Sequence, residues 1–142
     1  MKVLFRGCLA GLLWLFSTGA WAGPECADFL RAGARPPQVL EFVGCESAPQ
    51  AQGAPLTATY RVEGRHAHEV ERYLQRLTGQ MGDLTFVCCG WETKGFTSYR
   101  DKASGRQYQL GMGSEETPYN RRGDWHKIDY FYVRVVLYTE EV

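Results

Sequence analysis

The amino-acid sequence predicts an α+β fold, in which a mainly antiparallel sheet of about five strands carries one main helix and a short N-terminal helix. Segments 56–62 and 125–139 show the two-residue period of a β-strand, and segment 65–78 shows the three- and four-residue spacing of a helix. Every connection except those around the main helix is short enough for a hairpin, which favours antiparallel pairing.

The first third of the chain predicts a short helix and a strand. Residues 25–32 form the helix, because Cys26, Phe29 and Leu30 share one side and the segment runs into Gly33 and two prolines. The stretch 39–45 is rich in β-branched and aromatic residues and predicts the first strand. A loop with several prolines and glycines follows over 46–55.

The middle of the chain predicts a half-buried strand and the main helix. In 56–62 the side chains that share the apolar face are Leu56, Ala58, Tyr60 and Val62. In 65–78 one apolar stripe consists of Ala67, Val70, Leu74 and Leu77, and the charged surface positions are Glu69, Glu71, Arg72 and Arg76. Gly79 supplies the end of this helix.

Three further strands are expected in the last third. Residues 84–91 form one strand, and the polar stretch through Gly105 is a long hairpin connection. The segment 107–112 alternates again, and a loop covers 114–124. The longest strand spans 125–139, with an aliphatic and a tyrosine-rich face.

Residues 1–22 have the three parts of a secretory signal peptide. Lys2 and Arg6 precede an apolar run over 8–16, and Ala20 and Ala22 form the small-x-small cleavage pattern. We expect cleavage after Ala22, which leaves 23–142 as one soluble periplasmic domain. A retained membrane anchor is the alternative, and the shortness of the apolar run disfavours it.

The charge balance disfavours partners that bind to a basic surface. Cleavage removes Lys2 and Arg6, so the mature chain keeps 14 of its 16 basic residues against 16 acidic ones. Binding to nucleic acid or to a membrane surface through a basic patch is therefore not expected, because both require clustered positive charge. Nor do we expect membrane insertion after cleavage.

Four cysteines remain in the mature chain, and an oxidising compartment favours two disulfides among Cys26, Cys45, Cys88 and Cys89. Neighbouring side chains on a strand point to opposite faces, so the adjacent pair is poorly placed to bond to itself. We therefore favour two long-range bridges, one linking Cys26 and the other linking Cys45 to the 88–89 pair, and which of the two sulfurs each one takes is left open. A metal site or a reactive thiol centre is the alternative, which the adjacency of the two sulfurs disfavours.

Four segments together resemble a known family. They are 26–30 (CADFL), 40–45 (LEFVGC), 58–62 (ATYRV) followed by Gly64, and 88–92 (CCGWE). In these segments the chain resembles the small exported proteobacterial proteins of the domain-of-unknown-function family DUF4952, over nearly the whole mature chain. The resemblance implies a bacterial envelope protein and carries no catalytic residue.

No catalytic, cofactor or metal-binding residue is predicted. His66 and His68 are two apart at the start of a helix and diverge, and His126 stands alone. Glu92 and the pair Glu115-Glu116 would supply the two carboxylates of a glycan hydrolase, but nothing in the sequence sets their separation. An exposed acidic loop accounts for them more simply.

The aromatic residues indicate a binding surface instead. Tyrosine, tryptophan and arginine are enriched at interface hot spots, and the candidate partner-binding residues are Trp91, Tyr130, Tyr132, Arg134 and Tyr138. Packing of these tyrosines beneath a loop is the structural alternative. The leading hypothesis is a non-enzymatic periplasmic protein that binds another envelope protein, as an immunity protein or inhibitor neutralising a toxin or hydrolase. The alternative is an envelope enzyme or small-ligand-binding protein that uses the 91–99 and 114–125 loops.

Overall fold

The computed structural model describes residues 23–142. The predicted signal peptide and its cleavage site after Ala22 lie outside the described residues. Within residues 23–142, no helix combines the length and the apolar character needed to cross a membrane.

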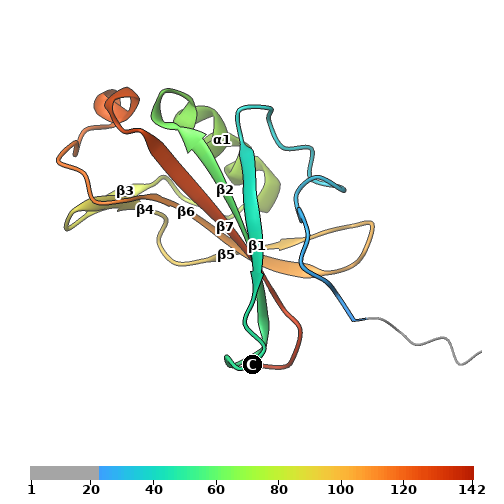
Figure 1. Cartoon of the computed structure of the whole chain (residues 1–142). Coiled ribbons are helices and arrows are strands. Elements are labelled where there is room, and N and C mark those ends of the chain that lie inside the picture. Colours follow the sequence, from blue (N-terminus) through green and yellow to red (C-terminus); the bar gives the residue numbers. More distant parts are fainter. Residues whose placement is uncertain (1–22) are drawn as a thin grey trace, which may run out of the picture.

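The described part of the chain forms seven antiparallel strands and one α-helix (Figure 1). The sheet has the order β1-β2-β7-β6-β4-β3, and β5 pairs with the first half of β6. In chain order the elements are β1 (Glu41–Ser47), β2 (Pro55–Glu63), the 3-10 helix η1 (Gly64–His66), α1 (Ala67–Thr78), β3 (Thr85–Val87), β4 (Gly90–Glu92), β5 (Thr97–Arg100), β6 (Gln107–Ser114), the 3-10 helix η2 (Arg122–Lys127) and β7 (Tyr130–Tyr138).

The sheet has more strands than the five expected, for a local reason. The predicted strand over 84–91 is two strands, because Cys88 takes a positive φ of 56° and forms with Cys89 the turn between β3 and β4. The polar stretch after Glu92 contains β5. The first part of the predicted last strand is η2, so β7 begins only at Tyr130.

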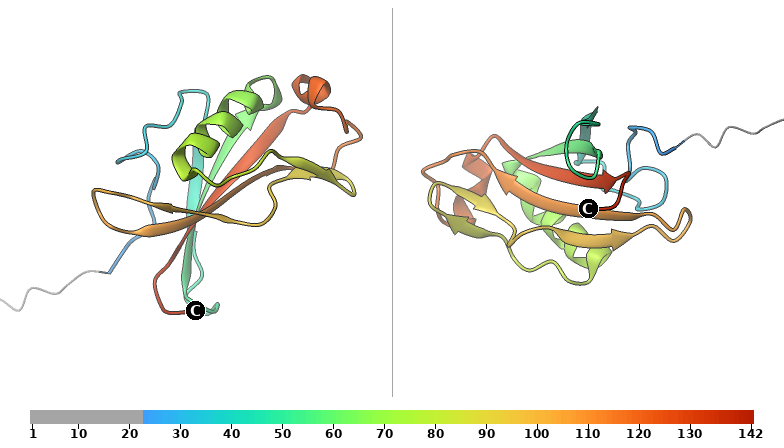
Figure 2. Two further views of the ribbon diagram at one scale, coloured as in Figure 1. Left: turned by 180° about the vertical axis from the view of Figure 1, so that it is seen from behind. Right: turned by 90° about the horizontal axis from the view of Figure 1, so that it is seen from below.

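The core lies between α1 and one face of the sheet, and α1 lies on one side of the sheet only (Figure 2). The predicted helix stripe is confirmed, with Ala67, Val70 and Leu74 fully buried and Leu77 partly buried. Gly79 ends α1 in the left-handed conformation at φ 68°. The predicted inward faces of β2 and β7 are also buried.

The predicted N-terminal helix is wrong. Residues 29–34 form a turn, in which the Ala34 amide donates to the Leu30 carbonyl at 3.0 Å. Arg35 follows with a φ of 45°, and Pro36 prevents a further turn, so the segment is too short to propagate a helix. Phe29 and Leu30 are nevertheless buried in the core, as their apolar character predicts.

Two buried tyrosines hold this N-terminal segment to the core. The Tyr60 hydroxyl donates to an Asp28 carboxylate oxygen at 2.7 Å and accepts from the Leu30 amide at 3.1 Å. The Tyr73 hydroxyl donates to the Ala34 carbonyl at 2.9 Å. Burial is the main cause that raises the pKa of each phenol above its ordinary value, and the bond to Asp28 raises that of Tyr60 further.

The protein is therefore expected to lose stability as the pH rises above about 10. In the unfolded chain these phenols ionise near pH 10, whereas the folded protein keeps them protonated. A raised folded-state pKa gives stability that is complete below the unfolded pKa and is lost as the pH climbs toward the folded one. Urea unfolding midpoints between pH 7 and 11 would show the decline. It should be shallower in Tyr60→Phe and unchanged in Tyr138→Phe, and a constant wild-type midpoint would contradict the prediction.

The cysteine pairing differs from the long-range bridges favoured above. One disulfide joins Cys26 to Cys45 and ties the N-terminal segment to β1. The other joins the neighbours Cys88 and Cys89. The expectation assumed that both lie on one strand, but the positive φ of Cys88 places them in a turn, where adjacent sulfurs can meet.

Strand β1 forms one edge of the sheet and is irregular. Its register with β2 shifts between Phe42 and Gly44, which leaves Val43 as a bulge. Phe42 and Val43 are both exposed at this edge. The Cys26–Cys45 disulfide attaches to the same strand.

Candidate functional site

The face of the sheet opposite α1, called here the open face, carries the side chains that alternate with the core residues. On β7 these include Tyr132 and Arg134. The strand register places Arg134 between Thr59 of β2 and Gly111 of β6, and Tyr132 between Arg61 and Gly113. Glu92 of β4 pairs with Gly113 and extends the second row.

A groove of about 610 Å³ lies on this open face. The strands β2, β7, β6 and β4 and the segment after β4 contribute its walls. Its lining residues are Thr59, Trp91, Glu92, Thr93, Gly95, Phe96, Gly111, Met112, Gly113, Ser114, Glu115, Tyr132 and Arg134.

Two glycines of β6 allow the neighbouring chain to lie close at this groove. A Cβ at Gly113 would stand 2.7 Å from the Trp91 carbonyl oxygen, so β4 could not approach β6 as it does. A Cβ at Gly111 would stand 3.0 Å from the Thr93 hydroxyl and 3.5 Å from the Phe96 ring. Phe96 thus lies along the groove beside Gly111, and 56 % of it is exposed.

The charged groups of the groove are of both signs. Arg134 is exposed and forms no ion pair with another residue of the described chain. Glu92 and Glu115 line the groove beyond β6, and both are exposed. Two strand spacings and a two-residue offset put the Arg134 and Glu92 Cα atoms roughly 12 Å apart. The groove therefore offers one cationic and one acidic end.

Arg61 marks the margin of the groove and already has partners. Its guanidinium donates to Glu41 at 2.7 Å and lies 4.7 Å from the centre of the Tyr130 ring. The hydrogen bond from Arg61 is the main cause that lowers the pKa of the exposed Glu41 carboxyl. Tyr130 is half-buried against this pair, so it borders the groove without lining it.

The predicted partner-binding residues are only partly brought together. Tyr132 and Arg134 both line the groove. Tyr138, which is 38 % exposed, lies at the far end of β7 against Gly53 and outside the groove. Trp91 is 5 % exposed, and its ring stacks edge-on against Trp125 in the core, so only a small part of it reaches the groove.

Three groove residues, Thr59, Thr93 and Phe96, are not among the individual candidates predicted from the sequence, although the predicted 91–99 loop contains Thr93 and Phe96. Thr59 lies on the face of β2 opposite Ala58 and Tyr60, and this alternation is visible in the sequence. Thr93 is 9 % exposed, and its hydroxyl accepts from the Met112 amide at 3.2 Å, which anchors the segment that carries Phe96. Nothing in the local sequence indicates that this segment crosses the sheet.

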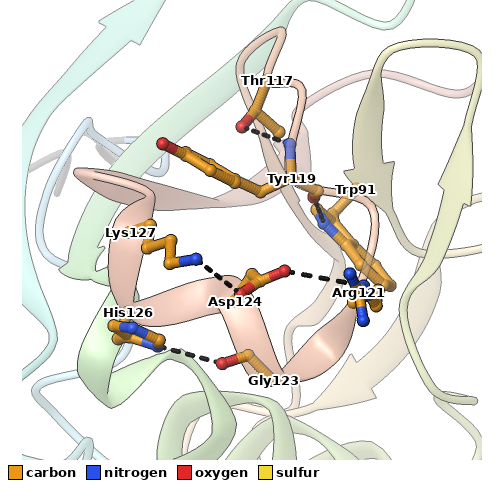
Figure 3. Close-up of polar contacts among 8 residues, drawn as sticks. All are labelled: Trp91, Thr117, Tyr119, Arg121, Gly123, Asp124, His126 and Lys127. Carbon is orange, nitrogen blue, oxygen red and sulfur yellow. Dashed lines mark hydrogen bonds and ion pairs between the residues drawn. The ribbon is translucent and has the colours of Figure 1, made fainter.

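The loop before β7 is held by its own polar contacts (Figure 3). The Trp91 indole donates to the Tyr119 carbonyl at 2.8 Å. Asp124 of η2 pairs with Lys127 at 3.0 Å and with Arg121, the residue before η2, at 3.9 Å. The bond from Lys127 is the main cause that lowers the pKa of the Asp124 carboxyl. These contacts fix the 114–125 loop at the end of the groove.

A buried ion pair joins this loop to the main helix. Arg122 donates to the Glu71 carboxylate at 2.5 Å and to the Leu84 carbonyl at 3.3 Å. Its guanidinium also lies 4.3 Å from the centre of the Trp125 ring. Glu71 was expected on the helix surface, yet its side chain is only 4 % exposed, because Arg122 supplies the charge that its burial requires.

The histidines lie outside the groove. His68 stacks on Trp125 with ring centres 4.2 Å apart, and His126 contacts the Gly123 carbonyl at 2.9 Å. His66 ends η1. Of the two carboxylates in the acidic loop, Glu115 lines the groove and Glu116 does not. Within residues 23–142, no three His, Cys, Asp or Glu side chains converge as a metal site would require.

Comparison with known proteins gives a family. No curated protein and no solved structure matches the chain. Residues 18–91, slightly more than half of the sequence, match the family described as domain of unknown function (DUF4952). The match ends at Trp91 and does not extend over residues 92–142, which the resemblance was expected to include. It includes β1, β2, α1 and β3 and stops before β5, β6 and β7. The chain belongs to the DUF4952 family.

Proposed function

We propose that this protein is an exported protein-binding domain, which uses the groove on its open face to hold a segment of a partner in the envelope. The observation that carries the proposal is Arg134, an exposed arginine with no ion-pair partner in the described chain, which lines the groove together with Tyr132 and the exposed Phe96. Aromatic and arginine side chains dominate binding energy when a partner excludes water from them.

The charges of the groove describe the segment that would fit. A carboxylate of the partner would pair with Arg134 and accept from the Thr59 hydroxyl on the neighbouring strand. A basic group roughly 12 Å away would reach Glu92 or Glu115. An arrangement of this kind discriminates strongly among partners, because a wrongly charged group at either end costs binding free energy.

An inhibitor or immunity protein that neutralises a toxin or hydrolase is the form of this activity that we favour. Such a protein needs a rigid recognition surface and no chemistry of its own. The Cys26–Cys45 disulfide and the buried Glu71–Arg122 pair make the body around the groove rigid. Disulfides are also what a protein working in the oxidising periplasm can keep.

A small-molecule ligand is the second candidate, and the groove itself favours it. A volume of about 610 Å³ lies in the range of ligand pockets. Residues of the 91–99 segment and the start of the 114–125 loop line it. In that case the ligand, and not a protein segment, would pair with Arg134.

Affinity capture with the mature protein from envelope extracts tests the proposal. We expect one stoichiometric protein whose purified form binds with an affinity that Arg134→Ala or Tyr132→Ala lowers by more than about tenfold. Arg76→Ala on α1, also an exposed arginine but on the covered side of the molecule, is the matched control and should bind normally. Native mass spectrometry of the same eluate would reveal a bound small molecule. Finding only such a molecule, lost in Arg134→Ala, would overturn the proposal in favour of the second candidate.

A further inference from the structure

The Cys88–Cys89 disulfide has no evident role in global stability. A disulfide stabilises a protein mainly by lowering the conformational entropy of the unfolded chain, and this effect grows with the number of residues enclosed between the two cysteines. Cys26 and Cys45 are 19 residues apart, whereas Cys88 and Cys89 are neighbours. The second bond therefore removes almost no conformational freedom from the unfolded chain, and its effect must be local.

The bond lies where a reagent can reach it. Cys88 and Cys89 form the turn at the tip of the β3–β4 hairpin, and Cys88 is exposed. Val87, next to it, is 51 % exposed, so the tip as a whole faces solvent. Access to a sulfur is one of the factors that control thiol–disulfide exchange.

The turn is held in a conformation that a free cysteine would leave readily. The φ of Cys88 is 56°, in the left-handed region that residues with a Cβ rarely adopt. The Cys89 amide bonds back to the Val87 carbonyl at 2.6 Å, which closes the turn tightly. The covalent bond between the two side chains keeps this turn from relaxing.

The same turn holds one end of the groove in place. The Cys89 carbonyl accepts from the Thr117 amide at 2.7 Å, and the Trp91 amide donates to the Ser114 hydroxyl at 3.0 Å. A Cβ at Gly90, between these two contacts, would stand 3.1 Å from the Glu115 carbonyl oxygen. Ser114 and Glu115 line the groove. A change in the conformation of the turn would therefore alter the hydrogen bonds that position Ser114 and Glu115 at the groove.

We propose that Cys88–Cys89 is a reversible thiol–disulfide exchange site, which takes electrons from a dithiol and whose state controls the 114–117 segment. One thiolate of the dithiol attacks the exposed Cys88 sulfur and releases Cys89 as a thiolate, which takes up a proton. The second thiol of the dithiol then attacks the mixed disulfide and releases Cys88. The dithiol leaves as a disulfide, and the protein gains two electrons and two protons.

The order of reduction is the first test. The oxidised protein is incubated in dithiothreitol mixtures of increasing reducing strength, quenched with iodoacetamide and examined by peptide mass spectrometry. We expect Cys88 and Cys89 to be alkylated at ratios of reduced to oxidised reagent at least about tenfold lower than those that open Cys26–Cys45. Opening of both bonds together, or of Cys26–Cys45 first, would overturn the proposal.

The effect on the groove is the second test. Hydrogen exchange of the Thr117 amide is expected to accelerate by about tenfold or more when Cys88–Cys89 is reduced, because the carbonyl that it bonds is no longer held. The double variant Cys88→Ser with Cys89→Ser should show the same acceleration without reductant. Amides of α1 serve as the internal control and should keep their protection. Unchanged exchange at Thr117 in a reduced, folded protein would contradict the link to the groove.

Neither test requires a binding partner. The exchange site and the proposed binding function can therefore be contradicted independently of each other. If the binding function is also right, the double serine variant should bind the captured partner with altered affinity, while Arg134→Ala should weaken binding by more than about tenfold in both redox states.

Discussion

Replacing Arg122 with alanine is expected to lower the free energy of unfolding by about 3 kcal/mol, because it leaves the Glu71 carboxylate buried without a countercharge. The Glu71 side chain is 4 % exposed and that of Arg122 is 37 % exposed. The arginine thus keeps some contact with water. The expected destabilisation is therefore at the lower end of the range of about 3 to 5 kcal/mol for breaking a buried ion pair. Arg122 also bonds the Leu84 carbonyl, so its loss loosens the connection between α1, the start of β3 and η2.

Chemical denaturation of matched variants would measure this effect. Arg121→Ala is the control, since this neighbouring side chain is 86 % exposed and lies 3.9 Å from Asp124, and it should change the stability by less than about 0.5 kcal/mol. Combining Arg122→Leu with Glu71→Leu removes both charges and should recover most of the loss. A stability change below about 1 kcal/mol in Arg122→Ala would show that Glu71 finds water or another donor.

Removal of the Cys26–Cys45 disulfide by two serine substitutions should destabilise the protein by a similar amount. Chain entropy for a loop of this length corresponds to about 3 kcal/mol. The bond ties the segment that contains the buried Phe29 and Leu30 to β1, so its loss also permits local release of that segment. The expected signs are a lower guanidinium midpoint and faster hydrogen exchange at the Leu30 and Ala34 amides.

The other disulfide provides the matched comparison. Serine at both Cys88 and Cys89 should change the global stability by less than about 1 kcal/mol, because the unfolded chain gains almost no freedom. An equal loss of unfolding free energy in the two double variants would mean that loop-closure entropy does not determine how much each disulfide stabilises the protein.

The regular elements were predictable because their signals are local. Segment 56–62 and the helix stripe of Val70 and Leu74 repeat with the periods of a strand and a helix, and both are buried as expected. The N-terminal segment also places apolar residues on one side. It could not become a helix, because the chain ends its turn at Arg35 and Pro36 before hydrogen bonds can accumulate.

The vicinal disulfide shows where local reasoning fails. Six of the eight residues over 84–91 are β-branched, aromatic or cysteine, which is the pattern of a continuous strand. The turn depends on a backbone angle at Cys88 that the residue types do not reveal. On a continuous strand the side chains of Cys88 and Cys89 would point to opposite faces. That assumption led to the wrong prediction of the disulfide pairing.

The groove was half predictable for a similar reason. Tyr132 and Arg134 share a face because they are two residues apart on one strand, which is visible in the sequence. Phe96 reaches the groove through tertiary contacts with Gly111, and Trp91 leaves the surface because the core has room for its ring beside Trp125. Neither placement has a signature in the local pattern.

The bulge at Val43 affects how readily other molecules can add to the edge of the sheet. An outer strand with unpaired amide and carbonyl groups and exposed apolar side chains is a template on which a second molecule can add a strand. At β1 the ladder is interrupted by the bulge, and the chain linked through Cys26 is held against the same strand. An incoming strand would find few consecutive hydrogen-bonding sites. The irregularity thus protects this small sheet from polymerising edge to edge, even though Phe42 and Val43 remain accessible to water.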